Sequence, residues 1–151
     1  MNSISKEIDK LQKENKKLIL YDGVCGLCNS AIQWIIKKDT HKTFKFLSLQ
    51  SDHGKLVLEH IGVSSNYTDS IILLDPNRAY YIKSKAALEI AKKLGKILYF
   101  LSLFLQILPI DFCDYIYDII SKNRYKWFGK NTCDLTLLNK GSKNAEDSFF
   151  L

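Results

Sequence analysis

Residues 18–38 read LILYDGVCGLCNSAIQWIIKK, and this stretch decides the fold. Its first four residues form an apolar run that is typical of a buried strand. Asp22-Gly23 breaks the run, Cys25-Gly26-Leu27-Cys28 follows, and the next residues place apolar side chains at helical spacing. The sequence therefore predicts two thiols at the point where a strand turns into a helix.

The segments that follow predict the rest of a mixed sheet. Strands are predicted at 43–49, 70–74 and 79–82, and helices at 52–61 and 85–94, with Ser51 and Ser84 as the caps of these two helices. The first strand, helix and second strand make a right-handed crossover, which makes those two strands parallel, and the hairpin adds antiparallel strands. This order predicts an α/β, thioredoxin-like fold, in which helices flank a mixed four-stranded sheet.

Four regions are expected along the chain. Residues 1–17 form a helical or frayed extension, residues 18–96 form the thioredoxin-like core, residues 97–138 form a C-terminal helical extension packed on that core, and residues 139–151 form a flexible tail. The extension is expected to hold helices at 97–108 and 111–122. The first of these is apolar on nearly every side and is interpreted as a core helix or a dimer face, with membrane-surface contact as the alternative.

Composition and charge narrow the class of protein. Lys and Arg number 22 against 16 Asp and Glu, which gives a formal charge of +6, and hydrophobic residues make up 46% of the chain. No run reaches the ~18 apolar residues of a membrane-spanning helix, and the polar start is unlike a signal peptide. We therefore expect a cytoplasmic protein. Thiols are kept reduced in that compartment, so the four cysteines indicate chemistry, metal binding or packing.

The position of the cysteine pair favours redox chemistry. The thiolate is the reactive form, and the free N–H groups and partial positive charge of a helix N-terminus stabilise it. We expect Cys25, the first and usually the more exposed thiol, to attack a disulfide. Cys28, one helical turn away, then resolves the mixed disulfide. This chemistry requires no metal or organic cofactor, but it does require a disulfide-containing protein or small thiol substrate and an unidentified electron donor.

Other interpretations of the motif remain open. Twelve residues separate Cys28 from His41, but eleven separate His41 from His53, where a zinc finger has three to five. A zinc site is therefore a minor alternative. A pair of inert, packed cysteines is another. A charged Asp22 is expected to oppose thiolate formation. Its alternative roles are to relay a proton to or from Cys28, to cap the helix through its carboxylate, or simply to form the turn.

The stretch DGVCGLCN at 22–29 resembles the DCC family of predicted thiol-disulfide oxidoreductases, which is named for an Asp-Cys-Cys signature. The similarity extends to Asp39, to FLSLQS at 46–51, to SKAAL at 84–88, to Tyr117, to NRYKWFGK at 123–130 and to Cys133. It spans residues 18 to 135. The resemblance implies a thioredoxin-like fold and a redox role for Asp22, Cys25 and Cys28, and it implies no particular substrate.

The chain departs from ordinary thioredoxins opposite the cysteines. Those proteins carry a cis-proline just before the third strand, where this sequence reads Tyr67-Thr68-Asp69-Ser70. Thr68, Asp69 and Ser70 are therefore candidates for the substrate groove, together with Gly26 and Leu27 of the motif. A narrow substrate range is expected.

Several further residues have an ordinary and a functional interpretation. Cys133 is a candidate third redox thiol, whereas Cys113 is expected in the core and the histidines in solvent. Residues 123–130 mix basic and aromatic side chains, which are expected to pack as a helix end. The alternative is a non-catalytic module that uses them to bind a protein, membrane or nucleic acid, although no nucleic-acid partner is expected.

Overall fold

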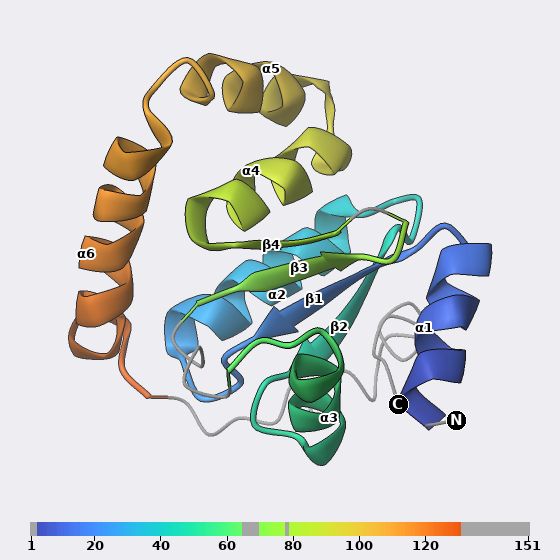
Figure 1. The fold of residues 1–151 in the computed structure, drawn as a ribbon. Helices are drawn as coiled ribbons and strands as arrows, with labels where there is room; N and C mark the ends of the chain where they lie inside the picture. Colours follow the sequence, from blue (N-terminus) through green and yellow to red (C-terminus); the bar gives the residue numbers. More distant parts are fainter. Residues whose placement is uncertain (1–2, 65–69, 78, 131–151) are drawn as a thin grey trace.

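The helices and strands follow the predicted order (Figure 1). The computed structural model describes residues 3–64, 70–77 and 79–130. Its elements are α1 (Ser3–Lys13), β1 (Lys17–Tyr21), α2 (Gly26–Lys38), β2 (Phe44–Ser48), α3 (Asp52–His60), β3 (Ile72–Asp75), β4 (Ala79–Ile82), α4 (Lys83–Leu94), α5 (Lys96–Leu105) and α6 (Ile110–Phe128). The expected tail at 139–151 lies outside the described residues.

The four strands form one mixed sheet in the order β2-β1-β3-β4. β1 runs parallel to β2, with Ile19 opposite Phe46, because α2 crosses over between them. β3 runs antiparallel to both β1 and β4. The predicted thioredoxin-like architecture is confirmed.

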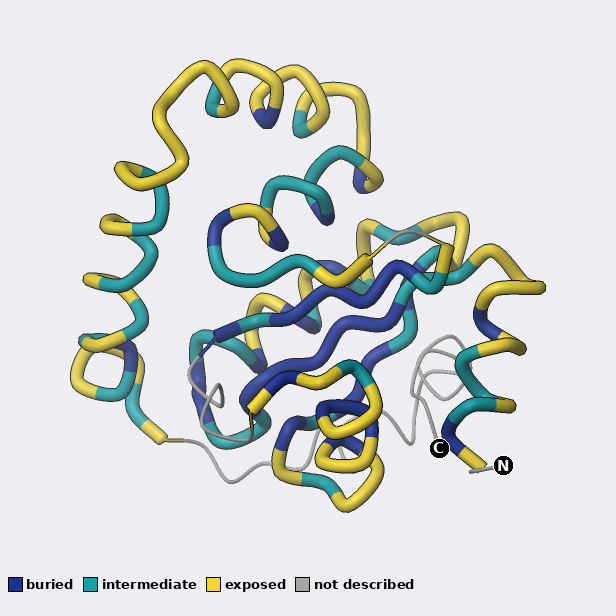
Figure 2. The backbone as a smooth tube through the Cα atoms, in the orientation of Figure 1, coloured by how far each residue is buried: buried dark blue, intermediate teal, exposed yellow. Residues whose placement is uncertain are grey.

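Alternating side chains of β1 bury both faces of the sheet. Leu18 and Leu20 pack with residues of α1 and α3, and Ile19 and Tyr21 pack with residues of α2 and α4. Figure 2 shows β1 and β3 as dark blue tubes along nearly their whole length. Because each fully buried large apolar side chain contributes about 1.5–3 kcal/mol, the end of β1 is a rigid base for the loop that follows it.

Two of the predicted helix starts have different outcomes. The Ser51 cap is confirmed, since its hydroxyl accepts a hydrogen bond of 3.0 Å from Gly54 N. The Ser84 cap is wrong, because α4 begins at Lys83 and no side chain caps it. The Ser84 hydroxyl instead donates to the carboxylate of Asp114, which ties α4 to α6.

The C-terminal helices differ most from expectation. α6 runs on to Phe128 and takes in most of the basic and aromatic segment. The core interpretation of the apolar helix is wrong, because Ile97 is 84% exposed and Phe100 67%. Cys113, also expected in the core, is only half-buried.

No single described helix is long and apolar enough to span a membrane. The one pair of described helices that together have the length and apolar composition of a span, α5 with α6, is bent by 112°.

Candidate active site

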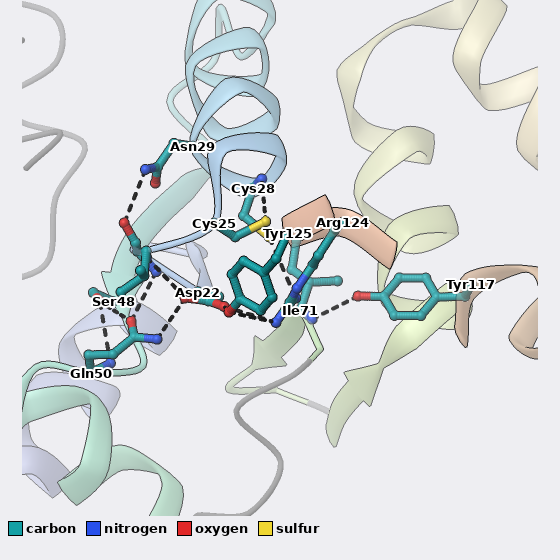
Figure 3. A network of polar contacts seen from close by, with 12 residues as sticks. Asp22, Cys25, Cys28, Asn29, Ser48, Gln50, Ile71, Tyr117, Arg124 and Tyr125 are labelled. Carbon is teal, nitrogen blue, oxygen red and sulfur yellow. Dashed lines mark hydrogen bonds and ion pairs between the residues drawn. The ribbon is translucent and has the colours of Figure 1, made fainter. Parts of the chain in front are cut away.

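The cysteine motif lies between the end of β1 and the start of α2 (Figure 3). Cys25 is the N-cap of α2, with an extended backbone, and its Sγ accepts a hydrogen bond of 3.4 Å from Cys28 N. Asn29 Nδ2 donates to Gly23 O at 3.0 Å and so holds the preceding loop in place. The Cys25 sulfur therefore accepts an N–H that the first turn of the helix leaves unpaired.

The two thiols have unequal surroundings. Both are reduced, and Cys25 is completely buried whereas Cys28 is half-buried. This order is the reverse of the exposure expected for an attacking first cysteine. Burial, together with the hydrogen bond and charge of Cys25, raises the pKa of Cys28 to about 12, although the Arg124 cation acts in the opposite direction. Cys28 therefore keeps its proton in the resting pair.

A short segment after α6 covers Cys25. Cys25 and Lys130 form an isolated antiparallel bridge, and Gly26 N donates to Gly129 O at 3.3 Å. Gly129 has φ 73° and ψ 175°, a conformation that is essentially restricted to glycine. We call residues 129–130 the covering segment, because they pair with the backbone of the buried Cys25 and its neighbour, and we expect a disulfide to reach Cys25 when this segment moves.

Asp22 is at the centre of a buried polar network (Figure 3). Its Oδ2 accepts from Arg124 Nη2 at 2.8 Å and from the Tyr125 hydroxyl, and its Oδ1 accepts from Gln50 Nε2 at 2.7 Å and from Val24 N at 3.0 Å. The side chains of Asp22 and Arg124 are 2% and 3% exposed. Asp22 thus forms the turn and pairs with a cation, and the helix cap is Cys25 instead.

Arg124 links this network to the thiols. Its Nη1 lies 3.8 Å from Cys28 Sγ while its Nη2 holds Asp22. The cation offsets the negative charge that Asp22 would otherwise place beside a thiolate. The sequence contains only an indirect signal for this contact, because Arg124 lies in the basic and aromatic segment that is expected to pack as a helix end.

The remaining candidate residues differ in burial, and three of them lie outside the described residues. Gly26 is buried, Leu27 is half-buried, and Ser70 is buried with no hydrogen-bond partner for its Oγ among the described residues. Thr68, Asp69 and Cys133 lie outside the described residues. The three histidines are exposed, and within 3–64, 70–77 and 79–130 no cluster of His, Cys, Asp and Glu could hold a metal ion.

The raised pKa values predict a stability that falls at high pH. Burial raises the pKa of Tyr117 as well as that of Cys28 to about 12, so the folded chain binds these protons more tightly than the unfolded chain does. Their contribution is complete below the unfolded thiol pKa of about 8.5 and is lost as pH rises toward 12. Urea midpoints of the reduced protein should fall over that range. The fall should be smaller in Cys28→Ala, and an equal fall would contradict this assignment.

Comparison with known proteins identifies the family of this chain. The chain is 40% identical over 120 residues to the Bacillus subtilis (strain 168) protein described as "Uncharacterized protein YuxK", covering 79% of this chain and 86% of that protein. It is 35% identical over 132 residues to a chloroplastic DCC family protein of Arabidopsis thaliana, covering 86% and 76%. No solved structure matches significantly. The sequence model of the DCC1-like thiol-disulfide oxidoreductases matches residues 19–130, and the chain belongs to that family.

Proposed function

We propose that the protein is a thiol–disulfide oxidoreductase in which Cys25 is the nucleophile and Cys28 the resolving thiol. The observation that carries this proposal is the Cys25 sulfur at the N-cap of α2, where it accepts the N–H of a Cys28 whose own thiol stays protonated. Membership of the family supports a redox role. The free N–H groups at a helix N-terminus donate hydrogen bonds to a sulfur placed there, as Cys28 N does to Cys25.

The reaction has two exchange steps. The Cys25 thiolate attacks one sulfur of a substrate disulfide, the substrate S–S bond breaks, and one substrate thiolate leaves while a Cys25–substrate disulfide forms. Cys28 then loses its proton to that thiolate or to water and attacks the Cys25 sulfur. This step releases the second substrate thiolate and leaves a disulfide between Cys25 and Cys28. The substrate gains two electrons, and a dithiol donor returns the enzyme to its reduced form.

Arg124 and Asp22 act on the second step. When Cys28 ionises, the Arg124 cation at 3.8 Å stabilises the thiolate that must form. Asp22 is a positioning residue, because it fixes the guanidinium from the opposite side. The covering segment and the absence of a proline beside Ser70 both favour a narrow range of disulfide substrates.

Trapping tests this assignment. The Cys28→Ser variant should hold a disulfide substrate on Cys25, because the resolving thiol is gone, and mass spectrometry of non-reduced peptides should locate the adduct. Cys25→Ser should trap nothing. Adding Cys113→Ser to the Cys28→Ser background is the matched thiol control and should leave the adduct on Cys25. An adduct on Cys28 in the Cys25→Ser variant, together with no adduct on Cys25 in the Cys28→Ser variant, would reverse the two roles.

A non-catalytic binding role for residues 123–130 is the second candidate. Packing of the aromatic side chains was expected, but Trp127 is 57% and Phe128 51% exposed, so both are available to a partner. Arg124 and Tyr125 from the same segment point into the Asp22 network instead. Full cellular function in a Cys25→Ser/Cys28→Ser variant, with loss of function in Trp127→Ala, would favour binding over redox chemistry.

A further inference from the structure

Helix α5 reverses the usual distribution of polar and apolar side chains. Its one fully buried residue is Ser102, whose hydroxyl donates to Tyr99 O at 2.7 Å within the helix. Several of its apolar residues are exposed, and exposed apolar residues continue into the turn beyond the helix. Ile97 is 84%, Phe100 67%, Phe104 67% and Ile107 79% exposed. Their spacing of three and four places them on one side, and we call these four residues the α5 face.

The α5 face belongs to a long uncharged stretch. Residues 97–110 read ILYFLSLFLQILPI and contain no charged side chain. Figure 2 shows α5 exposed along its outer side, away from α4. Isolated exposed apolar residues are ordinary, but a contiguous patch of this kind marks a surface that binds a partner or a membrane.

Basic residues lie at the amino end of the α5 face, and most come from outside the helix. A hollow of about 550 Å³ is lined by Lys92, Lys93, Gly95, Lys96, Tyr99 and Phe100. Lys92 is paired with Glu89 at 2.7 Å. Lys93 and Lys96 are exposed, and no described residue forms an ion pair with either of them. The sequence of α5 alone shows no basic face, and the turn at Gly95 supplies one by bringing the end of α4 beside the aromatic residues.

The length of α5 suits a helix that lies on a membrane. Its ten residues extend about 15 Å, half the ~30 Å hydrocarbon thickness of a bilayer. α6 turns away from it by 112°, so the two do not make a straight spanning rod. A helix in the interface places aromatic and aliphatic side chains at the acyl boundary and lysines beside lipid phosphates.

We propose that the α5 face binds the surface of a membrane that contains anionic phospholipids. Phe100 and Phe104 enter the interface, while Lys93 and Lys96 contact the headgroups. Charge complementarity selects this occupant, because the unpaired charges beside the hollow are of one sign. The inference is independent of the thiol chemistry.

Vesicle sedimentation tests the proposal with the whole 151-residue chain. The wild type should bind phosphatidylcholine vesicles that contain phosphatidylserine, and added salt should weaken this binding. Phe100→Ser/Phe104→Ser should bind at least tenfold more weakly. Lys93→Gln/Lys96→Gln should lose about fivefold per lysine on anionic vesicles only. Leu56→Ser is the matched control, because Leu56 is 48% exposed on α3, and it should bind like the wild type.

Two outcomes overturn the proposal. The first is failure of the vesicle experiment itself. This means either that the wild type does not bind anionic vesicles, or that Phe100→Ser/Phe104→Ser binds as well as the wild type while showing the same urea midpoint. The second is a wild-type dimer in sedimentation equilibrium that this variant dissociates, without vesicle binding by either protein. That result would assign the α5 face to a second copy of the chain.

Discussion

Replacing Arg124 with glutamine should lower the free energy of unfolding by about 3–5 kcal/mol. Arg124 and Asp22 are both almost fully buried, and the guanidinium contacts the carboxylate at 2.8 Å. The substitution leaves the Asp22 charge in the interior with neutral donors alone, from Gln50, Tyr125 and the backbone N–H of Val24. Guanidinium chloride unfolding under reducing conditions measures the loss.

Two variants separate the buried pair from general effects of substitution. Asp22→Asn/Arg124→Gln removes both charges, so it should recover a large part of the stability that Arg124→Gln loses. Lys83→Gln is the matched surface control, because Lys83 pairs with Asp118 at 3.0 Å while their side chains are 29% and 40% exposed. Its effect should stay below about 1 kcal/mol. Equal losses of unfolding free energy in Arg124→Gln and Lys83→Gln would show that the buried pair stabilises the fold no more than a surface ion pair does.

The contact between Asp22 and Arg124 is a part of the site that the sequence could not predict. Local periodicity identified β1, α2 and the position of the thiols, because each depends on residues a few places apart. The contact between Asp22 and Arg124 joins residues 102 apart, and it depends on how α6 packs against α2. A carboxylate beside two thiols indicates that a cation is needed, but no spacing rule selects which of the 22 Lys and Arg residues supplies it.

The misinterpretation of α5 has a different physical cause. A helix that is apolar on nearly every side predicts burial, since hydropathy measures the preference of the side chains and not the surface available to cover them. The sheet faces were already covered by α1 with α3 and by α2 with α4. α5 therefore packs on the outside of α4, and most of its apolar side chains stay exposed.

Replacing Gly129 with alanine should increase the alkylation rate of Cys25 by roughly fivefold to 150-fold. The φ of 73° and ψ of 175° at Gly129 cost about 1–3 kcal/mol for a residue with a Cβ, and opening of the covering segment relieves that strain. The new methyl group meets no atom within 4 Å, so strain is the only added cost. Mass spectrometry of Cys25 peptides after timed iodoacetamide treatment, in a Cys28→Ser background, measures the rate.

Gly62→Ala provides the matched control for this experiment. Gly62 has a φ of 70° and open space where a Cβ would lie, but it follows α3, and its N–H donates to Glu59 O and not to the cysteine motif. It should cost a similar amount of stability while leaving the Cys25 rate unchanged. An equal acceleration by both variants would mean that Cys25 is reached through general unfolding. If only Gly129→Ala accelerates alkylation, the covering segment is the barrier between Cys25 and its substrate, and the yield of trapped disulfide should rise with the same variant.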